Sequence, residues 1–211
     1  MSKASIELHP RRRDEARALF RNAILEAAEA VFAEQGFHGA RIQDVAERAR
    51  VGVGTVYNHF AQKDDLLRAL VDERTDELLA RLAAAPDDKP DFAGRLGARI
   101  TRMLAYFDRH RGFYALVFRL TDGDGADEAQ RVLAGKSLRR LERFRAAFRS
   151  LVEEGVAEGA LEPIDAAHLA AFLGGAIKAF ALDALLDATA HPPAERARVI
   201  VRLFLRGAGK R

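Results

Sequence analysis

The chain has 211 residues, of which 49% are hydrophobic and 31% charged, and its formal net charge at pH 7 is +3. This balance is typical of a globular protein with one large or two modest domains, and two is our working count. The sequence contains no cysteine, which excludes disulfides, thiolate metal sites and cysteine nucleophiles.

The start of the chain lacks the apolar core of a signal peptide, and no uncharged run approaches the roughly 18 residues of a membrane span. We therefore expect a cytoplasmic protein that does not contact a membrane. Basic residues crowd the first 21 positions, and further basic runs cover 136–149 and 196–211. The first run predicts a flexible basic arm ahead of Asp14 that reaches DNA, although each run also fits a solvated helix face.

Apolar residues recur at helical spacing throughout, and no stretch alternates as a strand does, so the sequence predicts an all-α fold. The first helix is expected over 14–35, with Gly36 in a left-handed position at its end. Two short helices should follow at 42–49 and 53–59, and a long helix should open at Lys63 and end before the loop 86–90. The inner face of the first helix is predicted to consist of Leu19, Ile24, Ala28, Val31 and Phe32.

Beyond that loop we expect helices over 92–109, 112–121, 127–158, 165–188 and 193–207, with a loop at 122–125. The predicted domains are 1–62, an N-terminal arm and DNA-binding domain, and 63–211, with the helix 63–84 linking the two. The last two helices carry more apolar residues than one sparse domain can bury, which predicts a homodimer through them. The residues that suggest this are Leu169, Phe172, Leu173, Ile177, Phe180, Leu185, Val199, Ile200, Leu203 and Phe204.

The most informative stretch is 41–60, which reads RIQDVAERARVGVGTVYNHF. Its apolar residues have the spacing of a small core that joins two crossed short helices. The other face of the second short helix is polar and aromatic and carries no acid. There Thr55 can meet a base edge or a thymine methyl, and Tyr57 and His59 can donate to phosphates. The alternative is that Tyr57 and His59 only cap a helical hairpin.

The segment from about Ile24 to Leu67 closely resembles the N-terminal domain of the TetR family of transcriptional regulators. Residues 54–60, followed by Lys63, Leu66 and Leu67, match the family signature, while 31–37 and 43–46 match the end of its first helix and the start of its second. The resemblance implies a three-helix DNA-binding domain, a helical ligand-binding and dimerisation domain, and a third helix that reads the major groove. On this basis we expect DNA contacts from Arg41, Gln43, Arg50, Gly52, Val53, Gly54, Thr55, Tyr57, Asn58, His59 and Lys63.

Three positions depart from the family pattern. Ala40 and Arg41 stand where a threonine or serine usually caps the second helix, and Gly52 replaces a common serine cap. Arg50 replaces the usual turn glycine, which adds strain if its φ is positive but places a cation near the DNA backbone. These differences bear on the operator sequence and on helix ends.

Aromatic residues concentrate beyond residue 92, with polar or adaptable groups among them, as in an apolar ligand pocket with a few orienting groups. Simple core packing is the alternative for each of them. Lys178 is the one charge between Asp165 and Asp183, so it marks either an anionic ligand or a lysine at the dimer edge. The expected ligand-binding residues are Met103, Tyr106, Phe107, His110, Tyr114, Phe118, Phe144, Phe148, Phe172 and Lys178.

No nucleophile and base pair, glycine-rich phosphate loop or metal-ligand spacing is recognisable, so we expect no enzyme activity, no metal and no cofactor. The predicted function is a transcriptional regulator, specifically a repressor, that binds a palindromic DNA operator as a homodimer. A small apolar or aromatic effector would release it. Two alternatives stay open at this point: an activator of the same fold, and a nonspecific basic or architectural DNA-binding protein.

Overall fold

A computed structural model describes residues 10–84, 89–122, 128–187 and 191–208. These ranges are helical with short turns between the helices, so the predicted all-α class is confirmed. The chain divides into two compact units, Met1–Leu70 and Val71–Arg211, here called unit 1 and unit 2. The division falls within α4 (Lys63–Ala83), the helix that was expected to link two domains. The predicted loops at 86–90 and 122–125 lie largely outside the described residues.

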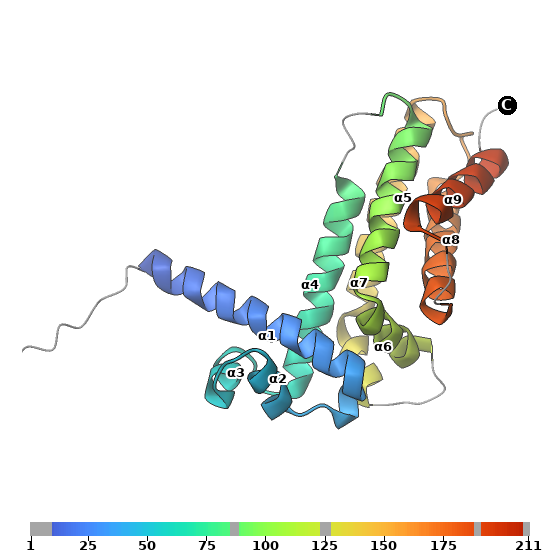
Figure 1. Cartoon of the computed structure of the whole chain (residues 1–211). Helices are drawn as coiled ribbons and strands as arrows, with labels where there is room; N and C mark the ends of the chain where they lie inside the picture. The colour runs from blue at the N-terminus through green and yellow to red at the C-terminus, as the bar shows by residue number, and fades with distance from the viewer. Residues whose placement is uncertain (1–9, 85–88, 123–127, 188–190, 209–211) are drawn as a thin grey trace, which may run out of the picture. The chain divides into compact units, whose positions relative to one another are not determined.

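Unit 1 contains α1 (Pro10–Gly39), α2 (Ile42–Arg48), α3 (Val53–His59) and the first turns of α4 (Figure 1). Its apolar side chains meet in one core because each short helix buries only one face. Ile24, Ala28, Val31 and Phe32 of α1 are buried as predicted. The rest of this core includes Leu25, Val45, Ala46, Val56, Phe60, Leu66, Leu67 and Leu70.

Two expectations for the first helix are wrong. α1 begins at Pro10 rather than Asp14, so residues 10–13 belong to the helix and not to an irregular arm. Proline suits this first turn because it has no N–H to leave unpaired. Leu19 was expected to face inward but is 71% exposed, because a residue five positions before Ile24 lies about 140° around the helix from it. At the other end, α1 continues to Gly39, and Gly36 kinks the helix where it was expected to end it, with φ 72° and ψ 169°, a backbone conformation that essentially only glycine adopts.

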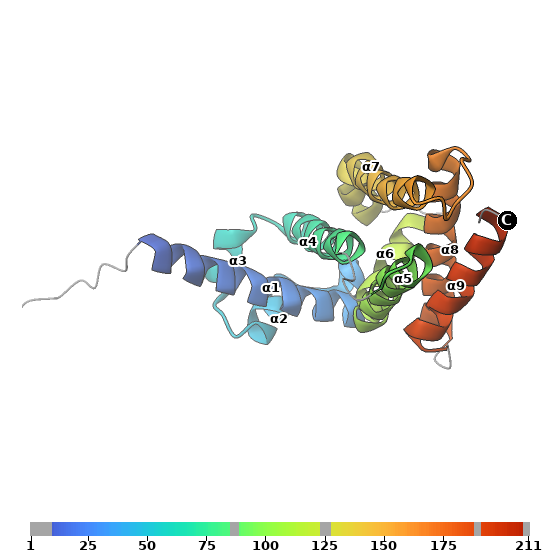
Figure 2. The same ribbon diagram turned by 90° about the horizontal axis from the view of Figure 1, so that it is seen from above.

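Unit 2 holds the rest of α4 together with α5 (Phe92–Arg109), α6 (Arg111–Asp122), α7 (Glu128–Ala157), α8 (Ala166–Leu186) and α9 (Pro193–Ala208). The predicted bounds of α5 to α9 agree with these to within two residues. Viewed from above, α7 lies beside α8, and α9 lies beside both α8 and α5 (Figure 2). Unit 2 is therefore a helical bundle in which α8 is a central member.

Close helix approach in unit 2 depends on Gly155 of α7. A Cβ atom there would lie 2.6 Å from Cζ of Phe92 and 2.8 Å from Cδ1 of Leu161. Contacts this short would force the neighbouring groups to move, so the site accepts no side chain without rearrangement. Ion pairs reinforce the same pair of helices, because Arg95 and Arg99 of α5 both bind Glu154 of α7.

α8 is the one helix among the described residues that is long and apolar enough to cross a membrane, judged by length and composition alone. Only 33% of its most apolar window is buried in the chain. Phe172 of α8 and Leu203 of α9 are 61% and 58% exposed, and Val199 is also exposed. The expected surplus of apolar surface is thus smaller than predicted, because half of the residues named for it are already buried within the chain: Leu169, Leu173, Ile177, Ile200 and Phe204.

Candidate nucleic-acid interface

α2 and α3 are joined by a tight turn at Ala49–Gly52. Arg50 has φ 56°, the one positive φ of a non-glycine residue in the described part of the chain. Its N–H donates to the carbonyl of Glu47 at 3.1 Å, and the N–H of Val51 donates to the carbonyl of Ala46 at 3.0 Å. The turn therefore requires a left-handed backbone conformation at Arg50, which the sequence alone left open. Arg50 adopts this conformation at the expense of some strain. Its side chain is exposed.

The start of α2 lacks the usual hydroxyl cap, as its sequence indicated. Arginine has no acceptor, so Arg41 cannot cap the helix with its side chain. Its backbone N–H instead donates to a carboxylate oxygen of Asp44 at 3.3 Å. A carboxylate in the first turn also interacts favourably with the helix dipole. Arg41 and Gln43 both remain exposed at this end of α2.

α3 has one buried side and one open side. Val56 is fully buried, whereas Gly52, Gly54, Tyr57 and Asn58 are exposed and Val53, Thr55 and His59 are half-buried. A Cβ atom at Gly54 would meet nothing within 4 Å, so a ligand could approach the backbone closely there. The open side combines a hydroxyl, a phenol, an amide and an imidazole without any carboxylate, as a surface that faces DNA requires.

Two arginines of α1 add positive charge beside the end of α3. The pKa of His59 is lowered chiefly by partial burial of its imidazole, and further by the charges of Arg17 and Arg21. The guanidinium of Arg21 lies 6.0 Å from the centre of the Phe60 ring. Neither arginine was among the expected DNA contacts. The sequence showed that the N-terminal region is basic, but only the fold shows that these two positions lie beside α3.

Lys63, an expected phosphate contact, has partners inside unit 1. Its ammonium donates to the carbonyls of Phe37, His38 and Ala40 at 2.7, 3.3 and 3.1 Å. It also lies 4.6 Å from the centre of the Phe37 ring, within range of a cation–π interaction. The three protons of the ammonium are thereby directed at the C-terminal end of α1, so Lys63 holds that end against the start of α4. A phosphate contact from Lys63 stays a prediction.

Five of the expected ligand-binding side chains gather in unit 2, and we call them the aromatic cluster. They are Tyr106 and Phe107 of α5, His110 directly after α5, and Tyr114 and Phe118 of α6. Tyr106 lies 4.4 Å from His110 and Phe107 lies 4.4 Å from Tyr114, measured between ring centres. Met103 is also buried on α5. These residues were expected from the sequence because polar groups occur among aromatic ones, and their role in ligand binding stays a prediction.

The other four expected ligand-binding residues lie apart from that cluster or at its edge. Phe172 is exposed and stacks on Phe204 at 6.3 Å between ring centres. Phe148 is packed against Gly174, and Phe144 is half-buried on α7. Lys178 is exposed, with its ammonium 5.5 Å from the centre of the Phe118 ring. Among the described residues, no three histidine, aspartate or glutamate side chains gather as a metal site would require.

A polar network borders the aromatic cluster. The hydroxyl of Tyr106 donates to Glu77 of α4 at 2.5 Å, and the guanidinium of Arg81 lies 4.2 Å from the centre of the Tyr106 ring. Arg74 pairs with the same glutamate at 3.0 Å. Burial and the hydrogen bond to Glu77 raise the pKa of Tyr106 far above its ordinary value, so the phenol stays a neutral donor at any physiological pH.

Unit 1 contains two short helices that cross over a shared core, and the second has an open face without acidic residues. This arrangement defines unit 1 as a helix-turn-helix DNA-binding domain. Residues 24–70 match the family model of bacterial regulatory proteins of the tetR family. The N-terminal domain of this chain therefore belongs to the TetR family, which confirms the resemblance seen in the sequence.

The chain is also similar to two named transcriptional regulators over longer stretches. The chain is 30% identical over 98 residues to FasR of Mycolicibacterium smegmatis, an HTH-type transcriptional activator, covering 46% of this chain and 45% of FasR. It is 26% identical over 147 residues to KstR2 of Mycobacterium tuberculosis, an HTH-type transcriptional repressor, covering 68% and 70%. The chain thus spans less than half the length of FasR.

Similarity to solved structures covers nearly the whole fold. The regulator FadR of Bacillus subtilis, crystallised with stearoyl-CoA, superimposes with a TM-score of 0.69 at 20% identity over 88% of this chain and 97% of that one. An identity this low supports the fold and leaves the ligand of this chain undefined. The TetR-like fold, with a three-helix N-terminal domain followed by a helical second domain, is confirmed.

Proposed function

We propose that the protein is a ligand-responsive transcriptional repressor that binds a palindromic DNA operator as a homodimer. The observation that carries this proposal is α3, in which Val56 is buried while Gly54, Tyr57 and Asn58 face outward from the same helix. This helix can enter a major groove with its backbone close to the bases at Gly54. Arg41, Arg50, Arg17 and Arg21 supply positive charge for the flanking phosphates.

A homodimer through α8 and α9 is part of the proposal. Phe172 and Leu203 leave large apolar surfaces in water, and a second copy of the same face would bury them. The apolar character of α8 then reflects a helix covered on one side by its own chain and on the other by its partner. Two recognition helices are also needed to read a palindrome, whose half-sites lie about 34–36 Å apart or a multiple of this.

The proposed effector is a small apolar or aromatic molecule bound at the aromatic cluster. The cluster offers ring faces together with the Tyr106 hydroxyl and the His110 imidazole as orienting groups. Lys178 lies beside Phe118 and would favour an effector with an anionic group. The acyl-CoA bound by FadR is an example of such a molecule and supports this class for the present chain.

Coupling between effector and operator is proposed to run through α4, which contributes to both units. Within unit 2, Asp72 of α4 pairs with Arg140 of α7 at 3.0 Å, and Asp76 pairs with Arg143 at 2.6 Å. The Tyr106–Glu77 bond ties α5 to the same helix. An effector that displaced α5 or α7 would therefore act on α4, and coupling of this kind typically amounts to about 1–3 kcal/mol.

The decisive experiment is selection of genomic DNA fragments by the purified protein, followed by footprinting of the protein on the selected fragments. We expect a symmetric protected site whose discrimination against other DNA persists in moderate salt. Binding without sequence preference that disappears as salt rises would support the nonspecific alternative instead. Transcription in vitro from a promoter containing the site then separates a repressor from an activator. The activator alternative is supported by the similarity to FasR, which is an HTH-type transcriptional activator.

A further inference from the structure

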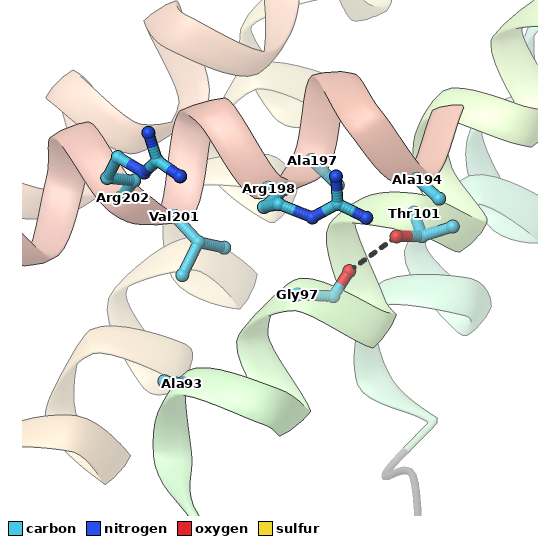
Figure 3. Close-up of a pocket in the computed structure, with 8 residues that line it drawn as sticks. All are labelled: Ala93, Gly97, Thr101, Ala194, Ala197, Arg198, Val201 and Arg202. Carbon is cyan, nitrogen blue, oxygen red and sulfur yellow. Dashed lines mark hydrogen bonds between the residues drawn. The ribbon is translucent and has the colours of Figure 1, made fainter. Parts of the chain in front are cut away.

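Unit 2 has a surface groove between α5 and α9, and none of its lining residues belongs to the aromatic cluster (Figure 3). Its volume is about 340 Å³, which is near the lower end of the range for small-molecule sites. The two helices run in opposite directions, with Thr101 opposite Ala194 and Ala93 opposite Arg202. The lining residues are Ala93, Gly97, Thr101, Ala194, Ala197, Arg198, Val201 and Arg202.

The floor of the groove is apolar and open because its side chains are small. A Cβ atom at Gly97 would lie 3.8 Å from Cγ2 of Val201, an ordinary contact distance, so the helices do not need glycine there in order to pack. The hydroxyl of Thr101 donates to the carbonyl of Gly97 at 2.7 Å and so is committed to its own helix. What remains for an occupant is mainly methyl and methylene surface.

The groove is also positively charged. Arg198 and Arg202 lie one turn apart on α9, and no carboxylate is among the lining residues. Within the part of the chain that the structure describes, neither guanidinium makes a hydrogen bond or an ion pair. Arg196 on the same helix is different, because it is buried, is paired with Asp108 and donates to the carbonyl of His191. The two groove arginines are thus available to an anion.

We propose that this groove binds a medium-chain alkyl carboxylate, with the carboxylate held by Arg198 and Arg202 and the chain lying on the small residues of α5 and α9. Guanidinium groups match carboxylate oxygens in geometry as well as charge. The eight helical rises from Ala93 to Thr101 span about 12 Å, about the length of ten bonds of an extended chain. Val199 and Leu203, which we assign to the dimer, do not line the groove, so a dimer leaves it open.

Calorimetric titration of the full chain with octanoate tests the site, and octanol is the uncharged control. Octanoate should bind, and octanol should bind roughly tenfold more weakly or worse, because it lacks the charge-assisted hydrogen bonds. The double variant Arg198→Gln/Arg202→Gln should reduce octanoate affinity by a similar factor. Arg206→Gln removes the same charge from the same helix outside the groove, and it should leave affinity unchanged. Gly97→Leu, which fills the floor, should abolish binding.

Two outcomes of the octanoate titration would overturn the proposal. One is the absence of octanoate binding to the full chain. The other is octanoate binding that survives both the double variant and Gly97→Leu with circular dichroism unchanged, which would place the ligand elsewhere, for instance at the aromatic cluster. Sedimentation of Gly97→Leu completes the test. A changed oligomeric state would show that a second copy occupies the groove, and this too would refute a ligand site.

Discussion

The ammonium of Lys63 lies 2.7 Å from the carbonyl oxygen of Phe37 and 4.6 Å from the centre of its ring. This lysine therefore stabilises unit 1 in addition to any contact with DNA. We expect Lys63→Met to lower the free energy of unfolding by about 1–3 kcal/mol, because it leaves three carbonyls without their donor. Denaturant titration measures this change. A phosphate contact would in addition reduce the salt slope of DNA binding by about one unit, and an unchanged slope would leave Lys63 with the structural role alone.

Thr55 and Tyr57 should separate specificity from affinity. Thr55→Ala is expected to relax discrimination at one or two operator positions by roughly 1–3 kcal/mol, because a base contact is lost. Tyr57→Phe should weaken binding to all DNA about evenly, because a phosphate contact carries no sequence information. Binding-site selection with each variant is the measurement. An altered base preference in Tyr57→Phe would contradict the assignment.

Arg50 holds a positive φ that glycine would adopt without strain. Arg50→Gly should stabilise the protein by up to about 1 kcal/mol, the strain relieved being partly offset by the greater freedom of glycine in the unfolded chain. Glu47→Gly is a suitable control, since Glu47 is an exposed residue within α2 and glycine there should cost about 1 kcal/mol. Thermal unfolding compares them. If Arg50→Gly also weakens DNA binding, the guanidinium contributes the cation that its position suggests.

His59 should make both folding and DNA binding depend on pH. Its pKa in the folded protein lies below 6.5 because burial and two nearby arginines disfavour the imidazolium. The unfolded chain therefore binds the proton more readily, and this contribution to stability is present above about pH 6.5 and is lost as the pH falls through the folded pKa. Between pH 7.5 and 5.5, the free energy of unfolding should therefore fall more for the unaltered protein than for His59→Gln. Denaturation curves of both proteins at the two pH values measure this difference.

DNA should reverse that preference, because a phosphate beside His59 favours the charged form. Operator affinity is then expected to rise as the pH is lowered from 8 toward 6, with uptake of a proton on binding. His59→Gln should remove the pH dependence without removing binding itself. A pH profile identical in the two proteins would exclude His59 from the phosphate contacts.

The exposed apolar residues of α8 and α9 predict a monomerising variant. Leu203→Asp should prevent association, lower operator affinity by at least tenfold and leave the helical content intact, because this side chain is 58% exposed in the single chain. Leu19→Asp is the matched control, since Leu19 is still more exposed but lies on α1. Sedimentation of both variants decides the matter, and a dimer that survives Leu203→Asp would rule out this face.

The order and bounds of the helices could be predicted well from the sequence because they depend on local features. Gly52 and Pro193 mark helix ends, and apolar spacing marks helix faces. The family signature at 54–60 identified the DNA-binding helix for the same reason, since all its residues lie within two turns of one helix. Leu19 was misplaced because it is apolar but lies about 140° around α1 from Ile24 and on the opposite side from Ala28, so it does not share their buried face.

The sequence by itself determined the fold class, the helix-turn-helix and the family of the N-terminal domain, all of which follow from short-range patterns. Only the tertiary structure decided which charges act together. It directed Lys63 toward carbonyls at the end of α1 and set Arg17 and Arg21 beside His59. It also left Arg198 and Arg202 without a hydrogen bond or ion pair to any other described residue, above an open groove. Electrostatic interactions depend on distances across helices that are far apart in sequence, and no local pattern encodes those distances.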